Sequence, residues 1–76
     1  MKMRYVAVAE VERRRLAMAV SKAELCRRAG IAYSTYKYVQ SGRAATELVA
    51  AKLAKALEVQ LDEISAPVEH SQRRAS

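Results

Sequence analysis

The sequence has no phenylalanine and no tryptophan, and it contains only one cysteine, one histidine, one proline and two glycines. A core must therefore be built from Leu, Val, Ile, Ala, Met and the four tyrosines. Hydrophobic residues make up 51% of the chain, and with so little proline and glycine this composition predicts a compact, mostly helical protein. Cys26 has no partner for an internal disulfide, so we expect it to be a small buried core residue.

The same scarcity excludes several classes of function. One cysteine and one histidine, His70, are too few for a zinc site, and no base is expected near Cys26 to activate its thiol. The eight acidic residues are scattered along the chain, and there is no glycine-rich loop for a phosphate. The sequence thus predicts a protein that is not an enzyme and that has no catalytic residue, metal, cofactor or small-molecule ligand.

No apolar run approaches the roughly 18 residues that a membrane span needs, so no membrane partner is expected. The lone cysteine and the absence of a hydrophobic N-terminal segment favour the reducing cytoplasm. Fourteen Lys and Arg residues against eight acids give a net charge of +6, which suits an anionic partner such as nucleic acid. A soluble basic protein without such a partner fits the charge equally well.

Seventy-six residues form one domain, whose small core makes a partner subunit useful for stability. Ser21 and Glu24 form an S-x-x-E capping box, Gly30 suits a left-handed helix end, and Thr46 suits an N-cap. No alternating strand pattern is visible. Together with the spacing of apolar residues, they predict five short helices in residues 1–66, at about 5–18, 22–29, 33–40, 47–57 and 59–64. Residues 67–76 are expected to form a frayed polar tail.

Two of these helices, joined by a short turn at Gly30, have the form of a helix-turn-helix over residues 22–41. From Val11 to Ile64 the sequence resembles the lambda-repressor-like helix-turn-helix family of Cro, C1 and XRE-type regulators. The matching residues are Ser21, Glu24, Leu25, Ala29, Gly30, Ile31, Thr35, Gly42 and the run Leu53-Ala54-Lys55-Ala56-Leu57. The resemblance implies an all-α, compact five-helix fold and a transcriptional regulator that binds double-stranded DNA sequence-specifically.

Three tyrosines fall in the recognition helix that the resemblance places at residues 33–40. With about 100° per residue, Tyr36 and Val39 fall on one side of this helix, which we expect to face the core. The opposite side carries the four residues that we expect to contact bases: Tyr33, Ser34, Lys37 and Tyr38. In the resembled family, groove contacts come from these positions, and phosphate contacts come from the positions of Lys22 and Arg43. Side chains that pack on neighbouring helices or on a partner protein are the alternative.

A homodimer on a paired operator is expected, with an interface at Leu57, Val59, Leu61 and Ile64. Leu61 and Ile64 lie on a segment that we expect to be too short to bury both in its own domain, and exposed apolar patches mark interaction surfaces. Dimerisation through residues 1–8 is the competing expectation.

The resemblance implies a repressor or an autoregulatory switch protein of a mobile genetic element, bound to the nucleoid. Two alternatives keep the same fold: an antagonist that grips another regulator through its tyrosines, and the antitoxin of a toxin–antitoxin pair. In either case a protein partner would replace or supplement the DNA.

Overall fold

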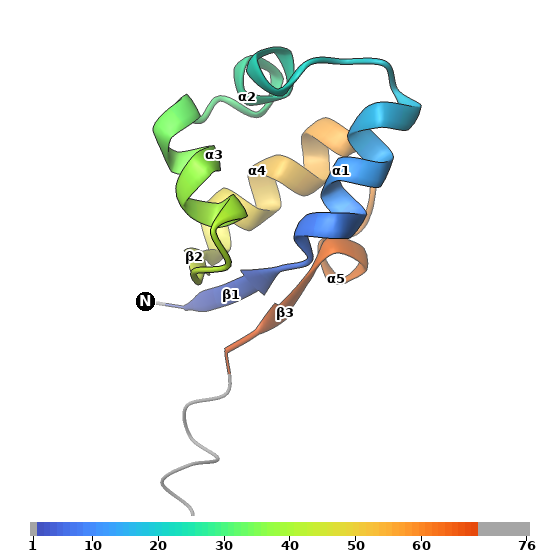
Figure 1. The fold of residues 1–76 in the computed structure, drawn as a ribbon. Coiled ribbons are helices and arrows are strands. Elements are labelled where there is room, and N and C mark those ends of the chain that lie inside the picture. The colour runs from blue at the N-terminus through green and yellow to red at the C-terminus, as the bar shows by residue number, and fades with distance from the viewer. Residues whose placement is uncertain (1, 69–76) are drawn as a thin grey trace, which may run out of the picture.

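The computed structural model describes residues 2–68, which form five helices and a small three-stranded sheet (Figure 1). The helices are α1 (Val8–Ala17), α2 (Lys22–Ala29), α3 (Tyr33–Gln40), α4 (Glu47–Leu57) and α5 (Leu61–Ile64). The strands are β1 (Met3–Val6), β2 (Ala45–Thr46) and β3 (Ser65–Pro67). The predicted five-helix, helix-turn-helix fold is confirmed, and the sheet is a minor addition to it.

The helix ends follow from the residues that the sequence places there. The Ser21 hydroxyl accepts a hydrogen bond from the Glu24 backbone N–H at 3.0 Å, and Thr46 accepts from the Val49 N–H at 3.2 Å. Gly30 ends α2 in the left-handed conformation, with φ of 73°. Only half of the expected capping box forms, because the Glu24 carboxylate accepts from Arg27 and Arg28 instead of capping α2.

α4 lies at the centre of the bundle, and the other helices surround it (Figure 1). Leu53 of α4 is fully buried, and so are Leu25 of α2 and Ile64 of α5. Val11 of α1 packs into the same core. Cys26 is buried there as predicted, and this burial raises the pKa of its thiol. A thiol that is kept protonated and away from solvent behaves as a small apolar side chain.

The sheet corrects the expectation for the start of the first helix, which was predicted to begin at about residue 5. Residues 5 and 6 belong instead to the strand β1, which lies between β2 and β3 in the order β2-β1-β3, and α1 begins at Val8. Both pairings are antiparallel, with Arg4 opposite Ala45 on one side and opposite Pro67 on the other. The sheet therefore joins the segment before α1 to the segment after α5. The sequence showed no alternating apolar pattern that would have predicted it.

The missing pattern has a physical cause, since the buried side chain of β1 is an arginine. Only 7% of the Arg4 side chain is exposed, and its guanidinium donates to the Ser65 hydroxyl at 2.7 Å and to Asp62 at 2.6 Å. Glu47 lies 3.5 Å away on α4. A buried cation is tolerated when ion pairs and hydrogen bonds satisfy it. Hydrophobic periodicity cannot detect a strand whose inward residue is charged.

The C-terminal part corrects the expected dimer interface. Ile64 is fully buried and Leu57 is 4% exposed, so both residues belong to the core of the monomer. Val59 and Leu61 are partly buried against that core. The short α5 buries Ile64 because it folds back onto α4 and α1, a contact that sequence spacing alone did not reveal. Leu57 and Ile64 are thus not available to a partner.

The boundary of the predicted tail also shifts. Pro67 is the last residue of β3, and the Val68 N–H donates to the Met3 carbonyl at 3.1 Å. These two residues are part of the sheet and were wrongly assigned to a frayed tail. The remainder of that predicted tail, including His70, lies outside the described residues.

Candidate nucleic-acid interface

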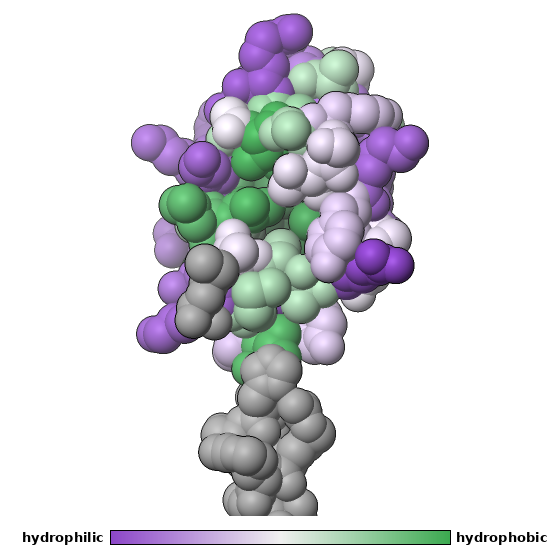
Figure 2. Space-filling model, turned by 90° about the vertical axis from the view of Figure 1, so that its left-hand side faces the viewer, coloured by the Kyte–Doolittle hydropathy of each residue, from purple (hydrophilic) through white to green (hydrophobic). Residues whose placement is uncertain are grey.

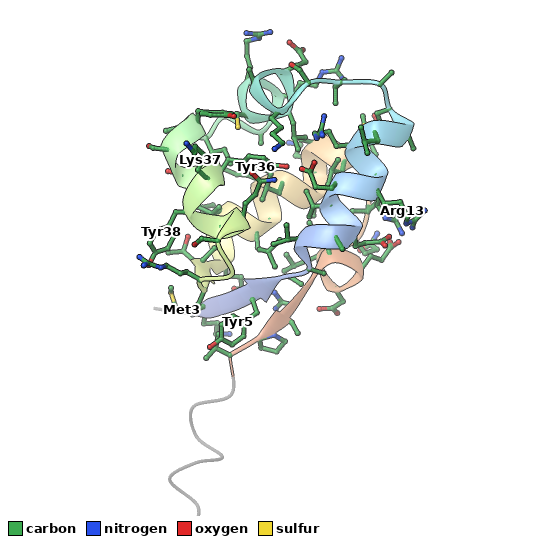
Figure 3. All side chains as sticks on the ribbon, viewed as in Figure 1. Met3, Tyr5, Arg13, Tyr36, Lys37 and Tyr38 are labelled. Atoms are coloured by element: carbon green, nitrogen blue, oxygen red, sulfur yellow. The ribbon has the colours of Figure 1, made fainter. Side chains whose placement is uncertain are left out.

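α3 has two chemically different sides, and they are the sides that helical periodicity predicts. Tyr36 is 1% exposed and Val39 is 2% exposed, whereas Tyr33 and Tyr38 are each about half exposed. The α3 outer face, defined by its four exposed residues, consists of Tyr33, Ser34, Lys37 and Tyr38. Tyr36 points from α3 toward α1, and Tyr38 lies on the outer side (Figure 3). The predicted assignment of one core tyrosine and two presented tyrosines in α3 is confirmed.

The inner side of α3 is tied to α1 through one carboxylate, that of Glu12. The Tyr36 hydroxyl donates to Glu12 Oε2 at 2.5 Å, and the Gln40 amide donates to the same oxygen at 3.0 Å. From α1 itself Arg15 donates to Glu12 at 2.7 Å, and its other terminal nitrogen donates to the Val20 carbonyl. Two residues of α3 and one of α1 therefore meet at a single acceptor group.

These hydrogen bonds shift the pKa values of Glu12 and Tyr36 in opposite directions. The hydrogen bond from Arg15 is the main cause that holds the pKa of Glu12 below its ordinary value of 4.5, and the bond from Tyr36 adds to it. Burial, reinforced by the bond to the Glu12 carboxylate, raises the pKa of Tyr36. Glu12 is thus ionised and Tyr36 protonated at neutral pH, which is the pairing that the hydrogen bond between them requires.

The two expected phosphate-contacting residues flank the helix-turn-helix. Lys22 is the first residue of α2 and is partly exposed. Arg43 follows α3 in an exposed loop, and its guanidinium carbon lies 5.2 Å from the centre of the Tyr38 ring. A cation–π contact at that distance restrains an otherwise free arginine beside the α3 outer face.

Ion pairing separates these cations from most of the arginines. Arg13 and Arg14 both pair with Glu10, Arg15 pairs with Glu12, and Arg27 and Arg28 pair with Glu24. Arg13 lies on the side of α1 away from α3 (Figure 3). Within residues 2–68, by contrast, Lys22, Lys37 and Arg43 form no ion pair, and neither do Lys2, Lys52 and Lys55. The first three belong to the helix-turn-helix or the loop after it, and their charge is available to an anionic ligand there.

The described residues hold no group of three or more His, Cys, Asp and Glu side chains that could bind a metal ion. None of the helices in residues 2–68 has the length and apolar character of a membrane span. The chemistry that the α3 outer face offers is hydrogen-bond donation, aromatic ring contact and positive charge on one exposed helix. A helix of this kind fits the major groove of duplex DNA, where side chains meet base edges.

Comparison with known families agrees with this geometry. A helix-turn-helix family model matches residues 11–64, which is well over half of the chain. The protein belongs to the helix-turn-helix family, of the Cro/C1-type XRE group. Members of this family are DNA-binding regulators of transcription and are generally not enzymes. Searches of curated proteins and of solved structures found no significant match.

The family match begins at Val11, so β1 lies before the helix-turn-helix domain and β3 follows it. The sequence indicates the exposed side of α3, but it does not distinguish Glu12 from the other acidic residues scattered along the chain. The available clue was its position one turn before Arg15 on α1, a spacing that brings the two side chains together. Nothing in the spacing indicated that Tyr36 and Gln40 would share the same carboxylate.

The two neighbouring tyrosines should respond differently to truncation. We expect Tyr36→Ala to lower the free energy of unfolding by about 3–5 kcal/mol, because it removes a buried aromatic ring. Tyr38→Ala should cost less than about 1 kcal/mol, as is usual for exposed positions. Chemical denaturation followed by circular dichroism measures both. Equal losses, or a larger loss for Tyr38→Ala, would contradict the assignment of the two faces.

Acid should weaken the link between α1 and α3. Because the folded-state pKa of Glu12 is lowered, its contribution to stability is present above pH 4.5 and is lost as the pH falls through the folded-state value. Glu12→Gln should therefore cost about 1–3 kcal/mol at neutral pH and lose less stability than the parent on acidification. Unfolding curves from neutral to acidic pH test this, and Glu58→Gln, an exposed residue without an ion pair in residues 2–68, is the matched control.

Proposed function

We propose that the protein is a sequence-specific transcriptional regulator that binds double-stranded DNA as a homodimer on a paired operator. One observation carries the proposal: the α3 outer face is exposed while the opposite side of α3 is fixed to α1 and the core. A rigidly held helix that presents polar and cationic side chains is what base recognition requires. Membership of the helix-turn-helix family supports the same use of α3.

The four residues of the α3 outer face would divide the reading of bases. Lys37 donates to guanine O6 or N7, and Ser34 is short enough to bond either a base edge or the backbone. Tyr33 and Tyr38 each offer a hydroxyl and a ring edge, which suits a phosphate and a thymine methyl group. Lys22 and Arg43 would contact phosphates on either side, which sets the register of α3 in the groove without reading sequence.

Regulation would follow from occupation of a promoter. A protein bound over a promoter excludes the polymerase, so we propose a repressor or an autoregulatory switch that acts on the nucleoid in the cytoplasm. The mobile-element setting rests on the family resemblance. Two half-sites about one DNA turn apart, or ~34 Å, suit a two-fold pair of recognition helices.

The competing function, an antagonist or antitoxin that binds another protein, draws on one feature. Tyr33 and Tyr38 are half exposed, and tyrosine is enriched at protein interfaces. Lys22, Lys37 and Arg43 favour DNA over this alternative. Cations that have no ion pair attract an anionic partner, whereas a face that binds another protein does not require them. Binding experiments with duplex DNA separate the two functions.

Binding to the selected operator should depend steeply on salt. A dimer that neutralises four phosphates through Lys22 and Arg43 gives a slope of about −4 in a plot of log affinity against log salt concentration. Duplexes selected from a random library, titrated by fluorescence anisotropy at several salt concentrations, provide the measurement. A flat response, or equal affinity for a scrambled duplex, would favour the protein-binding alternative.

Two lysine variants separate base reading from general attraction. We expect Lys37→Ala to reduce discrimination between the operator and scrambled DNA by about 1–3 kcal/mol with no loss of helicity. Lys55→Ala removes the same charge from the exposed end of α4, and it should leave that ratio unchanged. The same anisotropy titration measures both variants. Equal effects of the two substitutions would show that Lys37 acts only through its charge.

A further inference from the structure

The loop that follows α3 carries Arg43, and it is held at both of its ends. At its start the Gly42 N–H donates to the Val39 carbonyl of α3 at 3.1 Å. At its end β2 begins two residues after Arg43, and within residues 2–68 β2 pairs with β1 alone, with Ala45 opposite Arg4. The position of the loop therefore depends on β1 as well as on α3.

β1 also supports the start of α4 and the end of α3. The Glu47 N–H, which is the first of α4, donates to the Lys2 carbonyl at 3.0 Å. Met3 forms one wall of an apolar pocket of about 190 Å³, which Tyr38 of α3 and Val49 of α4 also line. Met3 and Tyr38 lie at the same corner of the molecule (Figure 3), and Figure 2 shows hydrophobic side chains gathered around a hollow on this side. Three segments around the α3 outer face thus share β1 as a support.

Arg4 is the residue that attaches β1 to the helical domain. Its guanidinium bonds to Ser65 and pairs with the carboxylates of Asp62 and Glu47. β1 adds only the partly buried Val6 to the hydrophobic core. The side chains of Asp62 and Glu47 are 89% and 43% exposed, so loss of the guanidinium leaves no unpaired charge buried. A change at Arg4 can therefore release β1 while the helical domain stays folded.

We infer that Arg4 is a positioning residue for DNA binding: it holds β1 in place, and β1 in turn holds Arg43 beside the α3 outer face. Arg4 does not contact DNA itself, because it is buried and ion-paired, so it acts through Arg43. β1 lies before residues 11–64, which match the family model, so this support is an addition to the helix-turn-helix domain. The inference rests on the proposed function, in which Arg43 contacts a phosphate.

Salt titrations of the full chain with the selected operator test this role. Arg43→Gln removes one phosphate contact from each protomer, which should change the slope from about −4 to about −2. Arg4→Gln should give the same slope, and the double variant should show no further change, because both substitutions remove one contact. Arg13→Gln is the matched control: it removes the same charge on the side of α1 away from α3 and should keep the parental slope. A parental slope for Arg4→Gln, or additive effects in the double variant, overturns the inference.

Amide hydrogen exchange of the full chain without DNA separates positioning from a general loss of fold. In Arg4→Gln the Glu47 amide should lose its protection, because its acceptor is the Lys2 carbonyl of the released segment. The Leu53 amide, within α4, should stay protected. Loss of protection at both amides, or retention at Glu47, overturns the inference. A parent that binds no duplex contradicts the proposed function, whereas a parent that binds the operator no differently from Arg4→Gln contradicts this inference alone.

Discussion

The orientation of α3 depends on the hydrogen bonds that converge on the Glu12 carboxylate. α3 is eight residues long and has no side-chain cap at Ala32, so it has little stability of its own and takes its position from tertiary contacts. Tyr36 and Val39 supply the burial, and the bonds from Tyr36 and Gln40 to Glu12 fix the rotation of the helix about its axis. The direction in which Lys37 and Tyr38 point is a consequence of that rotation.

Arg4 plays the corresponding part at the other end of the molecule. Its guanidinium joins β1 to Ser65 and Asp62, so the chain before the helix-turn-helix and the chain after it are held against each other. β1 also brings Met3 to the wall of the pocket beside Tyr38 and Val49. Without β1, the helical domain alone would lack this wall of the pocket.

Helix positions and faces were predictable because local chemistry determines them. Ser21, Gly30 and Thr46 mark helix ends through backbone hydrogen bonds and a left-handed turn, and the period of 3.6 residues separates Tyr36 from Tyr38. The contacts of Glu12, Arg4 and Ile64 were not predictable in the same way. Each joins residues far apart in the chain, and two of them place a charged side chain where apolar patterns give no indication.

The central claim is that α3, held from behind by Glu12, presents Tyr33, Ser34, Lys37 and Tyr38 to DNA. A titration of the ¹⁵N-labelled protein with a duplex selected for binding tests it most directly. The account predicts that amide shifts and line broadening concentrate on α3, at the start of α2 and at Arg43, while the outer side of α1 around Arg13 stays unchanged. Shifts concentrated on α1, with α3 unaffected, would contradict the account.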